Sequence, residues 1–192
     1  MQVFRGFHHP GIAPACALTI GNFDGVHRGH QAMLALLVSE AAHRGLPACV
    51  MTFEPNPRDW FAAKAGKPET APTRVSTLRD KLSELERCGI DQAVVLRFDA
   101  NLAGLAAESF IDDVLVRGLG TRYVLVGDDF RFGARGARRA AGVARGHGPA
   151  DDARPNLTGG PASTAGPLEL PPARPAPRRL PALRGHTRHH HP

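Results

Sequence analysis

Four short apolar runs alternate along the chain with stretches of helical periodicity, and this alternation constrains the fold more than any other feature. The apolar runs, each expected to form a buried strand, are residues 15–20, 48–53, 92–98 and 123–126. Between them, apolar residues recur every three or four positions, as in helices packed on a sheet, over residues 30–44, 77–89 and 105–117. This order predicts right-handed crossovers, and therefore an α/β fold with a parallel sheet and helices on both faces.

Three unusual loops follow strands, at the end of the sheet where such folds bind ligands. They span residues 21–29, 54–57 and 127–133. The first loop contains three glycines and leads into a helix, whose free N–H groups and positive dipole end favour phosphate. His27 and His30 are three residues apart, so both imidazoles share one face of the first helical turn, with Gly29 leaving room for a phosphate chain. The pair predicts a site that stabilises charge on a phosphate undergoing transfer.

Residues 21–30 read G-N-F-D-G-V-H-R-G-H, and the H-x-G-H at their end resembles the nucleotidyltransferase superfamily. H-x-G-H is shared with class I aminoacyl-tRNA synthetases, but the longer string is similar to the bacterial bifunctional riboflavin kinase/FMN adenylyltransferases, or FAD synthetases. Residues 52–58 (T-F-E-P-N-P-R) and 126–133 (V-G-D-D-F-R-F-G) resemble the same family. The resemblance covers about residues 12–138. It implies a Rossmann-like domain of the HxGH nucleotidyltransferase type over residues 1–138.

The resemblance also implies an activity and a set of site residues. AMP would pass from Mg²⁺-bound ATP to FMN, giving FAD and pyrophosphate, with His27 and His30 as catalytic residues. The residues expected on the nucleotide side are Gly21, Asn22, Phe23, Asp24, Gly29 and Asp129, with Phe23 and Asp24 shaping the turn. The residues expected in the flavin-side loop are Thr52, Glu54, Pro55, Asn56 and Pro57. The family often has His where Asn56 stands, so Asn56 is expected only to position substrate. No residue is assigned as a metal ligand, because ATP itself would carry the Mg²⁺.

The chain changes character near Arg138. All of its aromatic residues (one Trp, one Tyr and nine Phe) precede Gly133, and residues 139–192 are rich in Arg, Pro, Gly, Ala and His. Such a segment buries too little apolar surface to offset its ordering entropy, so a disordered tail is expected there. The family's later Ser-Ser/Thr-x-x-Arg segment and its riboflavin kinase barrel find no match. We therefore expect a domain that is incomplete at its C-terminal end and that does not phosphorylate riboflavin.

Several alternatives stay open at this point. The tail is either a shifted reading frame of a GC-rich coding sequence or a genuine basic extension, whose charge would bind RNA or anionic surfaces weakly and nonspecifically. The chain is either an active FMN adenylyltransferase or a catalytically impaired nucleotide-binding fragment of one. A third interpretation keeps the superfamily and changes the acceptor, for example to pantetheine phosphate or nicotinamide mononucleotide, although F-D-G-V-H argues against it.

Location and partners follow from composition. Cys16, Cys49 and Cys88 lack the spacing of a disulfide framework or metal site, so we expect buried free thiols. No apolar run approaches the ~18 residues of a membrane span, and the first ten residues lack the apolar region of a signal peptide. The expected protein is cytoplasmic and binds the small molecules ATP and FMN, with no membrane partner and no specific nucleic-acid partner.

Overall fold

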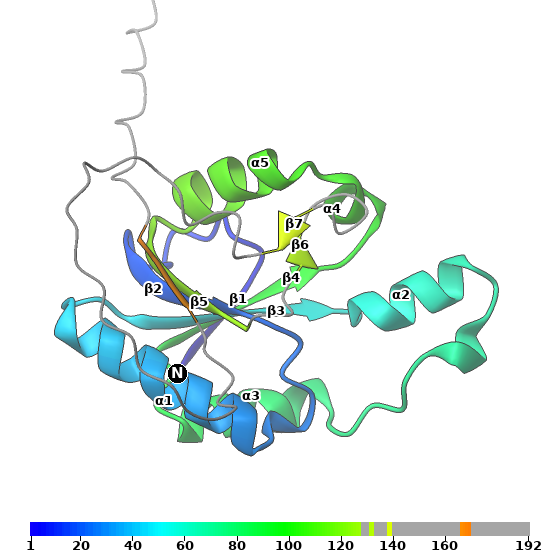
Figure 1. The fold of residues 1–192 in the computed structure, drawn as a ribbon, viewed down its shortest axis with the longest axis horizontal. Helices are drawn as coiled ribbons and strands as arrows, with labels where there is room; N and C mark the ends of the chain where they lie inside the picture. The colour runs from blue at the N-terminus through cyan, green and yellow to red at the C-terminus, as the bar shows by residue number, and fades with distance from the viewer. Residues whose placement is uncertain (128–130, 133–137, 140–165, 170–192) are drawn as a thin grey trace, which may run out of the picture.

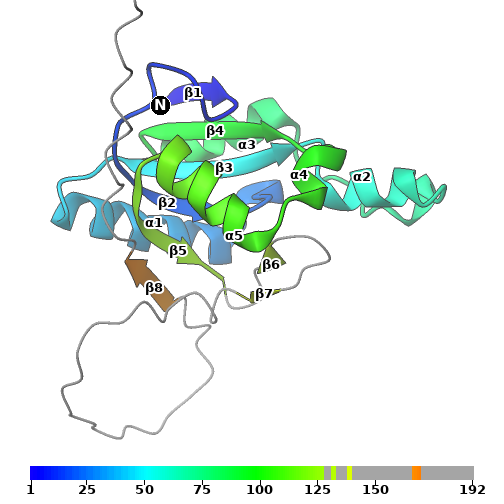
Figure 2. The same ribbon diagram turned by 90° about the horizontal axis from the view of Figure 1, so that it is seen from above.

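The computed structural model describes residues 1–127, 131–132, 138–139 and 166–169. A six-stranded sheet forms its centre, in the order β1-β4-β3-β2-β5-β8 (Figures 1 and 2). The strands are β1 (Gln2–Arg5), β2 (Cys16–Ile20), β3 (Ala48–Glu54), β4 (Gln92–Arg97), β5 (Thr121–Val126) and β8 (Gly166–Glu169). All pairings among β1 to β5 are parallel, and β8 runs antiparallel to β5. The predicted parallel sheet is confirmed.

Helices cover both faces of this sheet, as Figure 1 shows. α1 (Arg28–His43) and α3 (Leu78–Arg87) lie on one face, while α5 (Ala107–Ser109) and the π-helix η3 (Phe110–Gly118) lie on the other. α2 (Pro57–Lys64) projects beyond the end of β3 (Figure 2). The shorter elements are η1 (Asp24–Val26), η2 (Pro68–Thr70), α4 (Ala100–Gly104), β6 (Arg131–Phe132) and β7 (Arg138–Arg139). In the described part of the chain, no helix is long and apolar enough to cross a membrane.

Each face of the sheet has its own apolar core, because successive strand residues point to opposite sides. Leu18 and Met51 lie in the core under η3. Their neighbours Ala17 and Val50 lie in the core under α1 and α3. All four are buried completely. The sheet is therefore fixed from both sides, and the loops that leave its strands start from rigid positions.

β1 and α2 are among the elements that were not predicted, for different physical reasons. In β1 only Phe4 is buried, because this edge strand pairs with β4 alone and offers no apolar run to recognise. α2 begins inside the segment predicted as a loop. There the Asn56 side chain accepts a hydrogen bond from the Arg58 N–H at 3.0 Å, and Pro57 occupies the first turn, where a missing N–H is tolerated.

The single helix predicted over residues 105–117 is wrong in its boundaries. The structure has α4, then an extended step at Leu105 and Ala106, then α5 and η3 up to Gly118. α4 begins before the predicted helix, at Ala100, for a local reason. The Asp99 carboxylate accepts hydrogen bonds at 3.0 Å from the N–H groups of Asn101 and Leu102 and so caps α4.

β8 lies within the segment whose composition predicts disorder. Its backbone pairs with Tyr123–Val126 at the edge of the sheet, and the edge position accommodates Pro167, which has no N–H to donate. Most of residues 139–192 lie outside the described residues, so the predicted disorder stays a prediction. Asp129 and most of the predicted loop 127–133 also lie outside them.

Candidate active site

The segment of residues 21–30, here called the His loop, leaves the carboxyl end of β2 and enters α1. Its backbone is left-handed at Phe23 (φ 49°), Gly25 (φ 71°) and Val26 (φ 33°). A side chain in that region costs on the order of 1 kcal/mol or more. The core offsets this cost, since Phe23 and Val26 are only 0% and 2% exposed. Gly21 makes room for the packing, because a Cβ there would lie 3.1 Å from the Phe23 ring.

Asp24 ties the His loop to the segment before α3. Its carboxylate accepts hydrogen bonds from the N–H groups of Val75 and Ser76, both at 3.0 Å, and from the Ser76 hydroxyl at 3.2 Å. The Ser76 hydroxyl oxygen also accepts from the Gly25 N–H at 3.1 Å. Burial alone would raise the pKa of Asp24, but the hydrogen bonds from Val75 and Ser76 outweigh it and lower that pKa. Asp24 therefore holds the turn in shape, and its contact with a nucleotide stays a prediction.

His27 and His30 are stacked at the first turn of α1. Their ring centroids are 3.7 Å apart and the planes make an angle of 22°. His27 caps the helix, because its Nδ1 accepts a hydrogen bond from the His30 N–H at 3.4 Å. A neutral His27 ring then carries its proton on Nε2. Gly29 permits the stack, since a Cβ there would lie 3.2 Å from Cε1 of His27.

The two histidines differ in their surroundings. Nδ1 of His30 is buried without a hydrogen-bond partner in the part of the chain that the structure describes, whereas the His27 side chain is exposed. Burial lowers the pKa of His30, the charges of His27 and Lys81 lower it further, and Asp24 opposes them. Buried polar atoms are normally paired, so the unpaired nitrogen marks His30 as a group that a ligand can satisfy. A bound anion would also favour its charged form.

Topology brings the predicted loops together at one edge of the sheet. β2 lies between β3 and β5, because the chain continues from β2 to β3 and later returns to the other side of β2 as β5. The crevice at such a reversal is where open α/β sheets bind ligands. The His loop therefore lies between the end of β3, where the flavin-side loop begins, and the end of β5, where residues 127–133 begin.

The flavin-side residues have individual structural roles. Thr52 is fully buried in β3, and its hydroxyl donates to the carbonyl of Asn22 at 3.3 Å, which links β3 to the His loop. Glu54 forms an ion pair with Arg74 at 2.9 Å. Pro55 follows a cis peptide bond, and Asn56 and Pro57 start α2 as described above. Among the described residues, no group of three or more potential ligands is placed to hold a metal ion.

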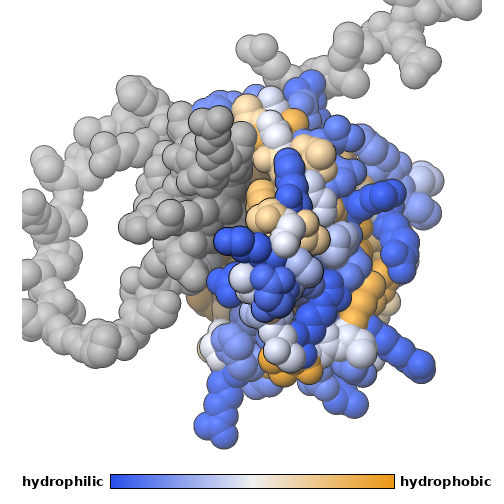
Figure 3. Space-filling view, turned by 90° about the vertical axis from the view of Figure 1, so that its right-hand side faces the viewer, coloured by the Kyte–Doolittle hydropathy of each residue, from blue (hydrophilic) through white to orange (hydrophobic). Residues whose placement is uncertain are grey.

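Sequence reasoning missed an aromatic cluster on the α2 arm, which we define as residues 54–74. Trp60 and Phe61 contact Phe98 edge-to-face, with ring centroids 5.5 and 5.7 Å apart, and Phe53 contacts Phe98 at 5.8 Å. Figure 3 looks onto the side from which α2 projects, where hydrophobic groups gather in a few places among hydrophilic ones. A signal was present, because Trp60 and Phe61 closely follow the T-F-E-P string and Phe98 follows the neighbouring strand β4.

Two cations near the site were also missed. Arg74 pairs with both Glu54 and Asp59. Lys81 is buried on α3, close enough to the His loop to influence the pKa of His30. The signal for Lys81 lay in its spacing, four residues before the buried Leu85 on the same helix face.

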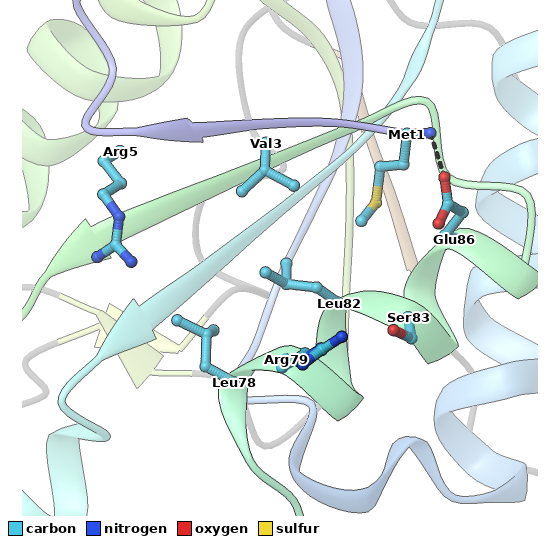
Figure 4. A pocket seen from close by; sticks show the side chains of 8 residues that line it. All are labelled: Met1, Val3, Arg5, Leu78, Arg79, Leu82, Ser83 and Glu86. Atoms are coloured by element: carbon cyan, nitrogen blue, oxygen red, sulfur yellow. Dashed lines mark hydrogen bonds and ion pairs between the residues drawn. The ribbon is translucent and has the colours of Figure 1, made fainter.

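A cavity of about 450 Å³ opens elsewhere, between the edge strand β1 and α3 (Figure 4). Its lining residues are Met1, Val3, Arg5, Leu78, Arg79, Leu82, Ser83 and Glu86. The Met1 amino group donates to Glu86 at 2.7 Å at one end of it. None of the predicted site residues lines this cavity, so the candidate site remains the carboxyl edge of the sheet.

The chain is similar to proteins of one family. The family model described as FAD synthetase matches residues 10–147. A bifunctional riboflavin kinase/FMN adenylyltransferase of Escherichia coli (strain K12) is 49% identical over 136 residues, which cover 70% of this chain and 42% of the relative. Proteins of the same description from Pseudomonas fluorescens and Haemophilus influenzae are 46% and 43% identical, with 69% and 70% of this chain covered and 41% and 42% of theirs. The chain thus spans less than half the length of these curated relatives.

Among solved structures, one described as the crystal structure of a macrolide-efflux protein from Streptococcus pneumoniae aligns with a TM-score of 0.59. It is 23% identical, over 73% of this chain and 45% of the other, and at that identity the likeness shows the fold alone. The match to the family model shows the family as well as the fold, because it covers the His loop and the flavin-side loop within one continuous stretch. This chain belongs to the FAD synthetase family.

Proposed function

We propose that this chain transfers AMP from Mg²⁺-bound ATP to FMN. A phosphate oxygen of FMN attacks the α-phosphorus of ATP, the bond from that phosphorus to the bridging oxygen of the β-phosphate breaks, and FAD and pyrophosphate leave. The observation that carries the proposal is the stacked His27–His30 pair at the N-terminus of α1, within a segment that matches the FAD synthetase family.

The geometry of the His loop supports the roles proposed for its residues. The N-terminus of α1 and the backbone at Gly21, Asn22, Phe23, Asp24 and Gly29 would receive the phosphates of ATP, with Asp129 completing the nucleotide side. His27 and His30 would stabilise the charge that grows on the α- and β-phosphates as the bond breaks. The unpaired Nδ1 of His30 supports this assignment, because this nitrogen can form a hydrogen bond and has no partner among the described residues.

FMN would lie toward the α2 arm. The loop formed by Thr52, Glu54, Pro55, Asn56 and Pro57 would border its phosphate. The aromatic cluster of Trp60, Phe61 and Phe98 offers apolar ring surface for the flavin. We also propose a cytoplasmic location, which the three free cysteines support, because reduced thiols persist in that compartment.

The test measures FAD formation by chromatography after incubation with Mg²⁺-ATP and FMN. We expect His27→Ala combined with His30→Ala to lower the rate by about 10²- to 10⁴-fold, the range for losing preorganised charge stabilisation. His43→Ala, an exposed histidine in the last turn of the same helix, is the control and should retain the rate. An unchanged rate in the double variant would refute the assigned roles.

The same assay separates the competing interpretations. Pantetheine phosphate and nicotinamide mononucleotide replace FMN in parallel reactions, and faster adenylylation of either would reject FMN as the acceptor. Calorimetry with ATP completes the comparison. ATP binding without product from any acceptor would identify a catalytically impaired nucleotide-binding fragment instead of an active transferase.

A further inference from the structure

Lys81 is buried where few lysines are found. Lys81 is only 5% exposed, and no other charged residue in the described part of the chain is buried to that degree. It lies on the inward face of α3 together with Leu85. Burial lowers the pKa of Lys81 from its ordinary value. Keeping an ammonium group here destabilises the fold unless something compensates, since buried lysines are normally paired.

The carboxylates around Lys81 provide only part of that compensation. Glu54, Asp24 and Asp59 are near enough to raise its pKa, but no described side chain forms an ion pair or hydrogen bond with its ammonium. Each carboxylate has another partner. Arg74 binds Glu54 at 2.9 Å and Asp59 at 2.7 Å, while Asp24 is occupied by the backbone at Val75 and Ser76. Lys81 therefore has three donors without a fixed acceptor.

The position of this ammonium relates it to the candidate active site. The groups that act on it come from the end of β3, from α2 and from the His loop, and its own charge lowers the pKa of His30. It thus lies among the histidines, which are proposed to face ATP, and the loop proposed to border the flavin phosphate. An anion bound between these two segments would be the missing acceptor.

We infer that Lys81 binds the phosphate group of FMN and positions it for attack on the α-phosphorus of ATP. This inference rests on the proposed function. The acceptor phosphate is favoured over the phosphates of ATP because Arg74, four residues before the start of α3, pairs with Glu54 of the flavin-side loop and with Asp59 of α2. These ion pairs tie the start of α3 to the side proposed for FMN. Lys81 holds phosphate oxygens through N–H donation, and no bond to Lys81 forms or breaks during the transfer.

The experiment compares FMN with riboflavin, which is the same flavin without the phosphate. Flavin fluorescence titrations give the affinities of the wild-type chain, of Lys81→Met and of Arg79→Met, an exposed cation on the same helix that serves as the control. We expect Lys81→Met to bind FMN about 10- to 100-fold more weakly, the range for losing a charge-assisted hydrogen bond. Riboflavin affinity should stay unchanged in both variants, and Arg79→Met should retain FMN affinity.

Thermal unfolding of the same proteins separates a binding role from a structural one. Lys81→Met should melt at or above the wild-type temperature, because methionine fills similar space and needs no charge partner. Lys81→Gln provides a second variant with a polar, uncharged end, and it should show the same selective loss for FMN. A preference for FMN over riboflavin that survives in both variants, or an equal loss for both flavins, would overturn the inference.

The outcomes also distinguish this inference from the proposed function. A wild-type chain that binds ATP and makes FAD, but shows no difference between FMN and riboflavin affinity, would refute the role of Lys81 alone. A wild-type chain that binds neither ATP nor either flavin would refute the proposed function and this inference with it.

Discussion

The His loop and the α2 arm lie beside each other at the carboxyl edge of the sheet, yet they are held in opposite ways. The His loop is fixed from within, by the fully buried Phe23 ring and by backbone N–H groups that donate to Asp24. The α2 arm is fixed from outside, by ion pairs of Arg74 and by edge-to-face contacts of Phe61, which is 52% exposed.

This difference teaches how such a site divides its tasks. Buried packing holds atoms closely because the alternatives leave cavities, whereas exposed ion pairs contribute little and are screened by solvent. The side proposed to bind the phosphates of ATP is therefore built in place before substrate arrives. The side proposed to bind the acceptor is built from contacts that a ligand can rearrange. Substitutions should damage stability on the first side and acceptor affinity on the second.

The largest expected effect comes from truncating the same residue type on both sides. Phe23→Ala should lower the free energy of unfolding by about 3–5 kcal/mol, because it empties a fully buried ring position. Phe61→Ala should lower it by less than about 1 kcal/mol, because half of that side chain is already exposed. Urea unfolding followed by circular dichroism measures both values. Similar losses in the two variants would remove the distinction between the two segments.

A smaller effect is expected at Asp24, and it depends on pH. Its pKa is lower in the folded chain than in the unfolded one, so it stabilises the fold above its ordinary pKa of about 3.9, and this contribution is lost as pH falls through the lowered value. Asp24→Asn should therefore cost about 1 kcal/mol at pH 6, a value that allows for partial solvent screening.

The two stability curves should converge as pH falls through the lowered pKa of Asp24, where the wild-type carboxylate takes up a proton. Unfolding by urea at several pH values between 3 and 6 provides the check. A constant difference between wild type and Asp24→Asn across that range would show that the charge of Asp24 does not hold the turn.

Much of the fold was readable from the sequence because the central strands are buried on both faces. Runs such as those of β3 and β4 are apolar nearly throughout, which the periodicity identifies directly. β1 escaped prediction because an edge strand with one buried residue has no such run. The predicted helix over residues 105–117 starts two residues too early because Leu105 and Ala106 are extended, and α4 lies before the predicted range.

Only the part of the candidate site that is formed by residues close together in the sequence could be predicted. His27, Gly29 and His30 are neighbours in sequence, so their spacing already predicts a shared helical face. Lys81 and Arg74 reach the same edge from α3 and the segment before it, and only the packing of those elements reveals their position. A lysine on an apolar helix face is a recognisable exception, but its neighbours depend on tertiary structure.

The smallest expected effect concerns Arg74, which joins Glu54 to Asp59 across the α2 arm. Because these ion pairs are exposed, Arg74→Met should change the free energy of unfolding by less than about 1 kcal/mol. Its expected consequence is a loosened arm, seen as a rise of a few-fold in KM for FMN with kcat for FAD formation retained. Arg79→Met, an exposed arginine on α3, is the matched control. A fall in kcat at constant KM would place Arg74 with the His loop instead, because it would mean that an exposed ion pair governs the transfer step itself.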